Sequence, residues 1–327
     1  MTLPDTGLLA WGTVMGIEEA VARANASRLL EQALDDGVLV PGARGYATAR
    51  THRIEHWLTT QHLAHDNRAP LDAVHAERRR TWTGAPPAAR RRLRGQLAPL
   101  LVSAPGVPAG TAEPLRWLLE SARDGVTLTQ AGYLPRALVT EAAERYDWYL
   151  PGRLPRTEHD VTRLATLHKL ARHTRLLARR HRTLSLTARG RQHLTDPALL
   201  QATAATAWYS DHDFTTTIAE AATEALLHGE RTLDDLTDSA HTLAAEAFTR
   251  TDGSTPAPDD TRHFLWQWLR PGEALGFLTH TDRRHSTITL TATGRAAALT
   301  ELRRRAHAPH HTLGITTCAQ KLCLRLA

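Results

Sequence analysis

An eight-residue pattern that occurs twice constrains the fold more than any other feature of the sequence. The segment LSLTARGR at 184–191 aligns with ITLTATGR at 288–295, and five of the eight positions are identical. Each copy follows a short apolar stretch, ending at Leu177 or Leu278, and a polar tip that carries arginine and histidine. Apolar and hydroxyl side chains alternate in both copies, with the two-residue period of a half-buried strand. We therefore expect two β-hairpins, each with a cationic tip.

Each copy also carries the signals for the start of a helix. Thr187 and Thr291 are placed as N-caps, because a threonine hydroxyl can accept a hydrogen bond from the free N–H groups of a first helical turn. In the second copy, the expected helix spans 294–306 and ends in three consecutive arginines. Positive charge there suits the negative end of the helix dipole.

The elements expected upstream of the two hairpins also correspond. In the first copy they are a helix, a short strand and two further helices, at 113–123, 126–129, 134–146 and 161–177. In the second copy three helices are expected, at 216–228, 233–248 and 261–269. Pro271 is expected to end or kink the last of these, and 251–260 is expected to be a loop.

This order of helix, strand, helix, helix and two-stranded hairpin resembles the winged-helix superfamily. The resemblance covers 111–306 in two tandem copies, and its most specific part is the LTxxGR pattern that follows a basic hairpin. The sequence is also similar to a group of actinobacterial proteins with recurring LTxxG segments, to which Leu128–Gly132 would belong. This resemblance implies a fold and no activity. The predicted class is mainly α with small β-hairpins (α+β), with tandem winged helices and a helical N-terminal region.

The first 110 residues are less regular. Helical periodicity is found at 17–34 and at 52–65, with a strand and turn expected at 37–42. A degenerate third winged helix at 1–60 is an alternative interpretation of this part. The predicted domains are a helical N-terminal region at 1–110, a basic winged helix at 111–197, a second winged helix with an acidic first half at 198–306, and a C-terminal tail at 307–327.

Composition limits the class of protein. With 327 residues, of which 42% are hydrophobic, the chain can fill two or three domain cores and is not expected to be disordered throughout. No apolar run approaches the ~18 residues that span a bilayer, and the N-terminus lacks the basic region of a signal peptide. The two cysteines provide no disulfide framework. These features predict a cytoplasmic protein that does not associate with membranes.

Charge is unevenly distributed along the chain. The segment 153–191 contains eleven basic and two acidic residues, 211–260 contains twelve acidic and two basic residues, and 262–305 is basic again. Of the 40 basic residues only Lys169 and Lys321 are lysines, a preference that resembles the codon bias of GC-rich actinobacterial genomes. Single arginines are therefore weak indicators of function, whereas clusters still set the local field. The alternation indicates modules with different partners, or modules that face one another.

The basic surface of the first predicted winged helix is the leading functional feature. In helix-turn-helix relatives, the helix before the hairpin enters the major groove of DNA and the hairpin contacts the adjacent backbone. Guanidinium groups neutralise phosphates, and a few can bond guanine edges. We therefore expect a DNA-binding protein, in the manner of a transcriptional regulator, that contacts double-stranded DNA through Arg163, Lys169, Arg172, Arg175, Arg179, Arg180, Arg182, Arg283 and Arg284.

An alternative interpretation needs no nucleic acid. The same arginines can form a solvated face in an arginine-rich chain, and the winged helices can serve protein contacts in a scaffold. In that case, the acidic region at 211–260 could dock on the basic module and hide it. Binding to duplex DNA that weakens steeply with added salt distinguishes the two hypotheses.

The second predicted winged helix differs from the first in its third helix, which carries Phe264, Trp266 and Trp268 in place of a row of arginines. Aromatic side chains dominate core burial, so a place in the core is the first expectation. The alternative is a protein interface, including a homodimer, that uses the outward-facing tryptophan.

Two histidine clusters raise the question of a metal. His52 and His56 lie one helical turn apart, and the other candidates are His62, His65, His307, His310, His311, Cys318 and Cys323. Neither cluster has the ligand spacing of a known zinc motif, so no metal and no cofactor is predicted.

Signals for enzymatic chemistry are weaker still. Nucleophile-elbow, phosphate-loop and dinucleotide-binding motifs are absent from the sequence. Asp211, His212 and Asp213 could orient a general base, but Asp213 also precedes a helix, where such a residue caps. No catalytic residue and no enzymatic activity are predicted.

Overall fold

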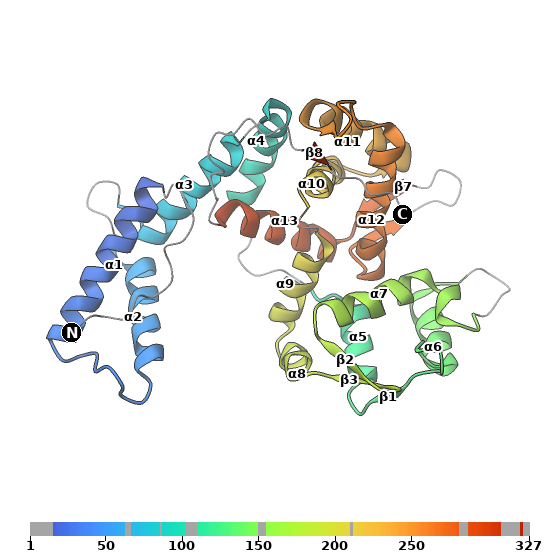
Figure 1. Cartoon of the computed structure of the whole chain (residues 1–327), viewed down its shortest axis with the longest axis horizontal. Helices are drawn as coiled ribbons and strands as arrows, with labels where there is room; N and C mark the ends of the chain where they lie inside the picture. Colours follow the sequence, from blue (N-terminus) through green and yellow to red (C-terminus); the bar gives the residue numbers. More distant parts are fainter. Residues whose placement is uncertain are drawn as a thin grey trace. The chain divides into compact units, whose positions relative to one another are not determined.

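The computed structural model describes residues 16–62, 67–85, 87–102, 110–149, 155–209, 212–280, 287–308 and 321–322. Contacts divide the chain into two compact units (Figure 1). The smaller unit comprises Met1–Ala85 with Arg304–Cys318, and the larger comprises Pro86–Arg303 with Ala319–Ala327. The expected class, mainly helical with small antiparallel sheets, is confirmed. In the described ranges, every helix is too short or too polar to traverse a bilayer.

The smaller unit is helical and has a thin core. Its helices are α1 (Ile17–Asp35), α2 (Tyr46–Thr60) and α3 (Pro70–Gly84), and α1 packs against both of the others. The carboxylate of Glu77 accepts hydrogen bonds from the backbone N–H groups of Glu18 and Glu19, at 3.2 and 3.1 Å, and so caps α1 from a neighbouring helix. In 16–62 the backbone forms no strand, and the strand expected at 37–42 is a turn closed by a bond from Leu39 N to Ala33 O.

The first repeat begins the larger unit's sheet-containing part. Its elements are α5 (Glu113–Ser121), β1 (Val126–Thr127), α6 (Arg136–Tyr146), a short 3-10 helix (Glu158–Asp160), α7 (Thr162–His173), β2 (Leu177–Arg180), β3 (Thr183–Leu186) and α8 (Ala188–Thr195). The strands form an antiparallel sheet in the order β1-β3-β2. Leucines from every layer, among them Leu118, Leu167 and Leu184, are fully buried and form its core.

The second repeat has the same order of elements. They are α10 (Asp213–Leu227), β4 (Arg231–Thr232), α11 (Leu233–Ala247), α12 (Pro258–Ala274), β6 (Leu278–His280), β7 (Thr287–Leu290) and α13 (Ala292–His307). Its strands are ordered β4-β7-β6, which matches the first sheet position by position. Outside this pattern lie α4 (Ala88–Val102), the connecting helix α9 (Pro197–Trp208), and β5 (Thr249–Arg250), which pairs with β8 (Lys321–Leu322) in parallel.

The LTxxG pattern is explained by the same two contacts in both repeats. Thr187 accepts a hydrogen bond from the N–H of Gly190, and Thr291 accepts one from Gly294, each at 2.9 Å, so both predicted N-caps are confirmed. A Cβ on Gly190 would lie 2.2 Å from the carbonyl oxygen of Leu176, and one on Gly294 would lie 1.9 Å from that of Phe277. Glycine is therefore required for the helix to approach the hairpin this closely.

Several element boundaries differ from expectation for identifiable reasons. α7 ends at His173 and not at 177, because Arg175 turns the chain with a φ of +58° and Leu177 already begins β2. α12 continues through Pro271, whose carbonyl accepts from Leu275 N at 2.9 Å and holds the final turn together. α12 also begins at Pro258, inside the expected loop, since proline is well tolerated at a first helical position.

Part of the acidic stretch of the second repeat is paired with arginines within the larger unit. Glu220 is completely buried and accepts two hydrogen bonds from Arg94, at 3.1 and 3.0 Å, while Arg90 bonds to both Glu220 and Asp213. The exposed pairs Arg92–Glu246 and Arg262–Asp234 and the partly buried pair Arg250–Asp260 add to this. Three of these arginines, Arg90, Arg92 and Arg94, come from α4, a helix that periodicity alone did not predict. The acidic region therefore pairs with α4 and with its own repeat, and does not cover the basic hairpin.

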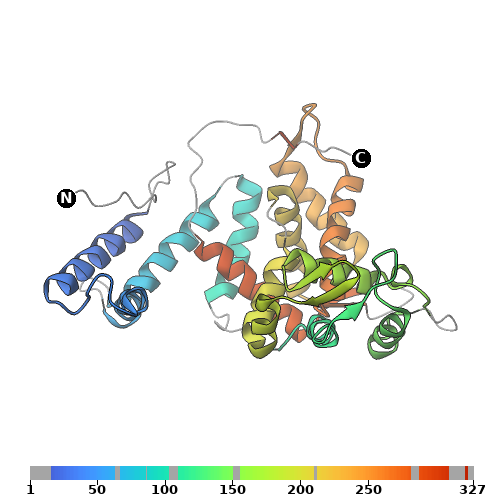
Figure 2. The ribbon, with the colours of Figure 1, turned by 60° about the horizontal axis from the view of Figure 1, so that its bottom comes forward.

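The two repeats meet through equivalent helices, α7 and α12 (Figure 2). Arg163 Nε lies 3.1 Å from Glu273 Oε2, and Trp266 lines a small cavity with Thr162 and Thr166. Trp268 is buried and stacks on Trp208 of α9, with ring centroids 4.8 Å apart. Of the three aromatic residues of α12, Trp268 is thus a core residue and Phe264 packs edge-on against Phe214, whereas Trp266 is half-buried beside the first repeat.

Candidate nucleic-acid interface

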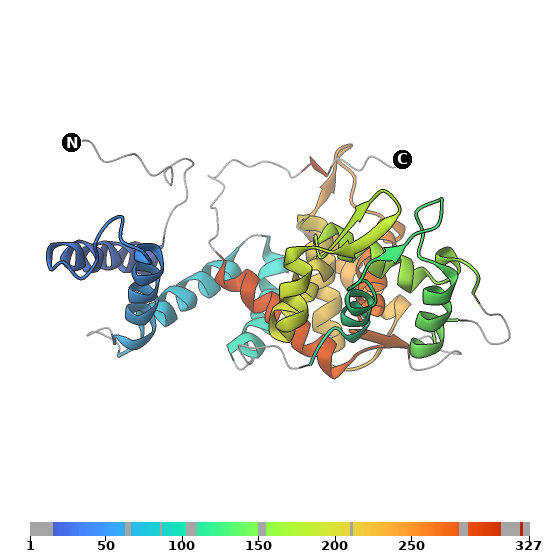
Figure 3. The same cartoon turned by 90° about the horizontal axis from the view of Figure 1, so that it is seen from below.

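The hairpin of the first repeat presents a row of exposed basic residues. β2 and β3 pair from Leu177–Leu186 to Arg180–Thr183, and the tip residues 181 and 182 are exposed. Figure 3 shows this hairpin, in yellow-green, at the periphery of its unit. The expected cationic hairpin is therefore formed and is open to solvent. Arg283 and Arg284, the predicted contacts of the second tip, lie outside the described residues.

The C-terminal half of α7 and strand β2 enclose a groove of about 960 Å³. Four predicted contact residues line it together: Lys169, Arg172, Arg175 and Arg179. All four are exposed, and they come from three successive segments, namely the helix, its turn and the strand. Because the helix packs against the hairpin, four positive charges that are spread over eleven positions of the sequence lie around one groove.

Some of the predicted basic residues already form hydrogen bonds or ion pairs within the protein, and others do not. Arg163 is paired with Glu273 of α12, where His280 Nε2 also lies 2.8 Å from the carboxylate. Arg182 donates to the carbonyl of Leu128, and Arg179 donates through Nε to the carbonyl of His181. The remaining side chains have no hydrogen bond or ion pair to another described residue: Lys169, Arg172, Arg175 and Arg180.

Glu273 is held ionised by its neighbours. Burial raises its pKa, but contact with His280 and the positive charge of Arg163 outweigh burial, so its pKa lies below the ordinary value. Arg163 therefore sits in a stable ion pair between repeats. It serves the α7–α12 contact rather than the groove, because the residues that line the groove do not include it.

A buried Glu–His pair supports the floor of the groove. Glu158 accepts a hydrogen bond from the N–H of Leu134, at 2.7 Å, and its other oxygen lies 2.8 Å from Nδ1 of His168. Both side chains are about nine-tenths buried or more, with residue exposures of 4% and 5%. His168 Nδ1 must donate to the carboxylate, because a carboxylate only accepts hydrogen bonds. The other ring nitrogen, Nε2, has no hydrogen-bond partner among the described residues. The pair fixes α7 against the loop that precedes α6.

Arg175 occupies a backbone conformation that disfavours a side chain. Its φ is +58°, and the equivalent position of the second repeat is Gly276, with a φ of +74°. Glycine adopts this region freely, whereas other residues are strained there. The first repeat thus keeps an arginine, at a cost of about 1 kcal/mol, where the second repeat has the residue that suits the turn.

The other candidate sites gain no support from geometry. His52 and His56 lie with parallel rings, centroids 6.4 Å apart, and the described residues contain no group of three or more histidine, cysteine, aspartate or glutamate side chains placed to hold a metal. His65, His310, His311, Cys318 and Cys323 lie outside the described ranges. Asp211 does as well, and Asp213 is bonded to Arg90, so it is not directed at a general base.

Sequence reasoning missed the charge pairing of α4 and one feature of the groove. The sequence analysis predicts neither a helix over the arginine run at 90–94 nor ion pairs between this run and the acidic residues at 211–260. Extending the repeat alignment upstream by a few residues would have placed Arg175 opposite Gly276, and an arginine at a glycine position is a signal of function rather than of folding.

Comparison with known proteins gives one partial match. Residues 115–199, from α5 to the start of α9, match the family model of the Y4jL N-terminal domain. The match therefore covers the first repeat and not the second. Neither a curated protein nor a solved structure is similar enough to count as a match. The chain is thus similar, over about its first repeat, to the Y4jL N-terminal domain.

Proposed function

We propose that both repeats are winged helices and that the first binds double-stranded DNA. The observation that carries the proposal is the convergence of four exposed, cationic side chains in one groove between α7 and β2. Helix order and strand order in each repeat agree with the winged-helix arrangement. The role fits a transcriptional regulator.

The accessible part of α7 determines what kind of contact is made. Its N-terminal half packs against α12 through Thr162, Arg163 and Thr166, which leaves the C-terminal half and the hairpin for DNA. Lys169 and Arg172 on that half are exposed and have no partner among the described residues. Such cations suit phosphates, which fix position but carry no sequence information. We therefore propose that most contacts of the first repeat are to the phosphate backbone of DNA and that fewer are to the bases.

Binding should show the salt dependence of a phosphate clamp. We expect the logarithm of the association constant to fall with the logarithm of salt concentration with a slope of about −4 to −5, because each of the five cations Lys169, Arg172, Arg175, Arg179 and Arg180 contributes ~0.9. Fluorescence anisotropy of a labelled duplex, measured at several salt concentrations with the full chain, provides the slope.

A quadruple variant tests the assigned surface. Replacement of Arg172, Arg175, Arg179 and Arg180 by alanine should reduce the slope to about −1 and abolish binding at physiological salt. A matched variant removes the same charge from other exposed positions: Arg44, Arg50, Arg123 and Arg136. Equal loss of affinity in both variants would show that net charge, and not this groove, is responsible.

A protein-interaction role is the competing outcome. If the unmodified chain binds no duplex at low salt, DNA binding is wrong and the hairpin serves another partner. The single variant Arg163→Ala gives an internal check, since Arg163 is occupied by Glu273. It should leave DNA affinity within about twofold of the parent.

A further inference from the structure

A second hollow in the larger unit lies beside the groove and has a different chemistry. It has a volume of about 840 Å³ and is bordered by the end of α7, the start of α8, α9, the start of α10 and α12. Residues from both repeats contribute, and all belong to the same compact unit. Nothing in the proposed DNA contact requires this hollow.

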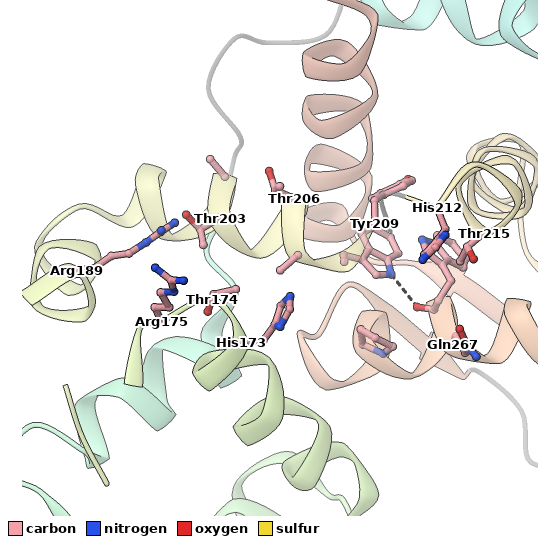
Figure 4. Close-up of a pocket in the computed structure, with 15 residues that line it drawn as sticks. His173, Thr174, Arg175, Arg189, Thr203, Thr206, Tyr209, His212, Thr215 and Gln267 are labelled. Carbon is pink, nitrogen blue, oxygen red and sulfur yellow. Dashed lines mark hydrogen bonds between the residues drawn. The ribbon is translucent and has the colours of Figure 1, made fainter. Parts of the chain in front are cut away.

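One end of the hollow is cationic. Figure 4 shows Arg175 and Arg189 at this end, with His173 between them and the opposite end. No aspartate or glutamate is found among the described residues that line the hollow. Both arginines are exposed, and Arg175 holds its strained backbone conformation here. An anion is therefore the charge that this end favours.

The wall next to Arg189 is fixed by hydrogen bonds. His193 Nδ1 donates to the carbonyl of Arg189 at 2.8 Å, so its Nε2 accepts from the hydroxyl of Thr203 at 2.9 Å. Burial lowers the pKa of His193, which keeps it neutral in this double contact. Because His193 is uncharged, the positive charge at this end comes from the arginines.

The other end of the hollow is aromatic. Trp208, Tyr209 and Trp268 line it, and Trp208 donates from Nε1 to the carbonyl of Trp268 at 3.0 Å. Trp268 is 1% exposed, and its own Nε1–H has no acceptor among the described residues. Aromatic side chains thus form this end, and aromatic rings pack well against one another.

We propose that this hollow binds an aromatic carboxylate, with the carboxylate at Arg175 and Arg189 and the ring on the tryptophan side. Arginine pairs with a carboxylate through two parallel N–H bonds, and flat rings pack well against buried aromatic side chains. The volume is that of sites for compact organic ligands. The binding step stands independently of DNA.

Occupation of the hollow bears on the groove through shared residues. His173 and Arg175 line both cavities. A ligand that holds Arg175 removes it from the phosphate contacts, so the ligand and DNA compete for the same guanidinium. This regulatory step rests on the proposed function, whereas ligand binding itself does not.

The direct test is isothermal titration calorimetry of the full chain with 2-naphthoate, without DNA. We expect binding at least tenfold tighter than that of the neutral analogue 2-naphthamide, because the amide lacks the charge that the arginines select. Inorganic phosphate serves as the second control and should bind at least tenfold more weakly than 2-naphthoate, since it has no ring. Equal binding of the amide or of phosphate would overturn the proposed ligand class.

Two single variants assign the site. Arg189→Ala should weaken 2-naphthoate about tenfold, since a charge-assisted pair is lost, and leave DNA affinity nearly unchanged, because Arg189 lines only the second hollow. Arg172 lines only the groove, so Arg172→Ala should weaken DNA binding and leave the affinity for 2-naphthoate nearly unchanged. Retention of full 2-naphthoate affinity by Arg189→Ala would overturn the site.

The regulatory step has its own readout. Saturating 2-naphthoate should lower DNA affinity of the parent by about as much as Arg175→Gly does, and should have no effect on DNA binding by Arg175→Gly. If 2-naphthoate binds and the chain never binds DNA, the proposed function fails while the ligand site stands. If DNA binds and 2-naphthoate does not, the ligand site fails while the proposed function stands.

Discussion

The two repeats are built on one scaffold and carry opposite surfaces. Both have the same strand order, the same threonine N-cap and the same glycine under the hairpin. The first presents unpaired cations on α7 and β2, whereas the acids of the second are bonded to α4 and to their own repeat. The residues that the backbone geometry requires, namely the capping threonine and the close-packed glycine, are therefore shared, while the charged side chains differ in sign and in burial.

The turn before each hairpin shows this divergence at a single position. Gly276 suits its left-handed conformation, and Arg175 tolerates the same conformation at a cost. An arginine that folding does not require points to a contact outside the fold. Arg175 lines both the groove and the hollow between the repeats, which agrees with that inference.

The largest effect should come from the buried charge cluster that joins Glu220 of the second repeat to Arg90 and Arg94 of α4. Glu220→Ala leaves Arg90 and Arg94 buried without their shared acceptor, and we expect a loss of about 3–5 kcal/mol in the free energy of unfolding. Urea denaturation measures it. Glu246→Ala breaks the exposed pair with Arg92 and should cost less than about 1 kcal/mol. Similar losses in the two variants would contradict the assigned burial.

The next effect tests whether the scaffold is truly common to both repeats. Gly190→Ala and Gly294→Ala each force a Cβ against a backbone carbonyl, and each should destabilise the chain by about 1–3 kcal/mol. Gly95, in the middle of α4, has open space around it, so Gly95→Ala should stabilise by about 0.5–1 kcal/mol. A large loss in one repeat alone would break the equivalence.

Loss of the N-caps is a smaller test of the same equivalence. Thr187→Ala and Thr291→Ala each remove the capping hydrogen bond and the bond that the hydroxyl donates to the carbonyl of Arg175 or Gly276, and should cost about 1–2 kcal/mol. Thermal unfolding followed by circular dichroism can compare them. Substitution of serine at either position retains the hydroxyl and should recover most of the loss; a serine variant as unstable as alanine would argue against capping.

The smallest effect concerns the pair that joins the repeats. The pKa of Glu273 is below its ordinary value in the folded state, so its ion pair contributes stability above the unfolded pKa near 4.5, and this contribution is lost as pH falls through the lower folded pKa. Glu273→Gln should cost about 0.5 kcal/mol at neutral pH and nothing at strongly acidic pH. A cost that is constant with pH would mean that Glu273 acts through packing alone.

The sequence predicted most of the local elements of the two repeats. Alternating strands, threonine caps and the order of helices in both repeats were confirmed, with boundaries shifted by a few residues. Pro271 was expected to interrupt a helix and does not, because its neighbours hold the last turn. Helices α3 and α4 were not predicted, since arginine-rich segments show little apolar periodicity.

The candidate site was predicted as a set of residues and not as a geometry. Lys169, Arg172, Arg175 and Arg179 were chosen for their charge and are now found around one groove. Arg163 was chosen by the same criterion and instead bonds across to α12. Charge alone does not distinguish these cases, because the distinction depends on which side chain from elsewhere in the chain lies opposite.

The sequence by itself determined the duplicated hairpin and the helix that follows it, because strand alternation, a cap and a close-packed glycine are encoded within a dozen residues. The tertiary structure alone decided that the arginines of α4 pair with Asp213, Glu220 and Glu246, that α7 meets α12, and that Arg175 lines two cavities. These are contacts between residues far apart in the chain, and their energies depend on burial and on the partner that packing brings within reach.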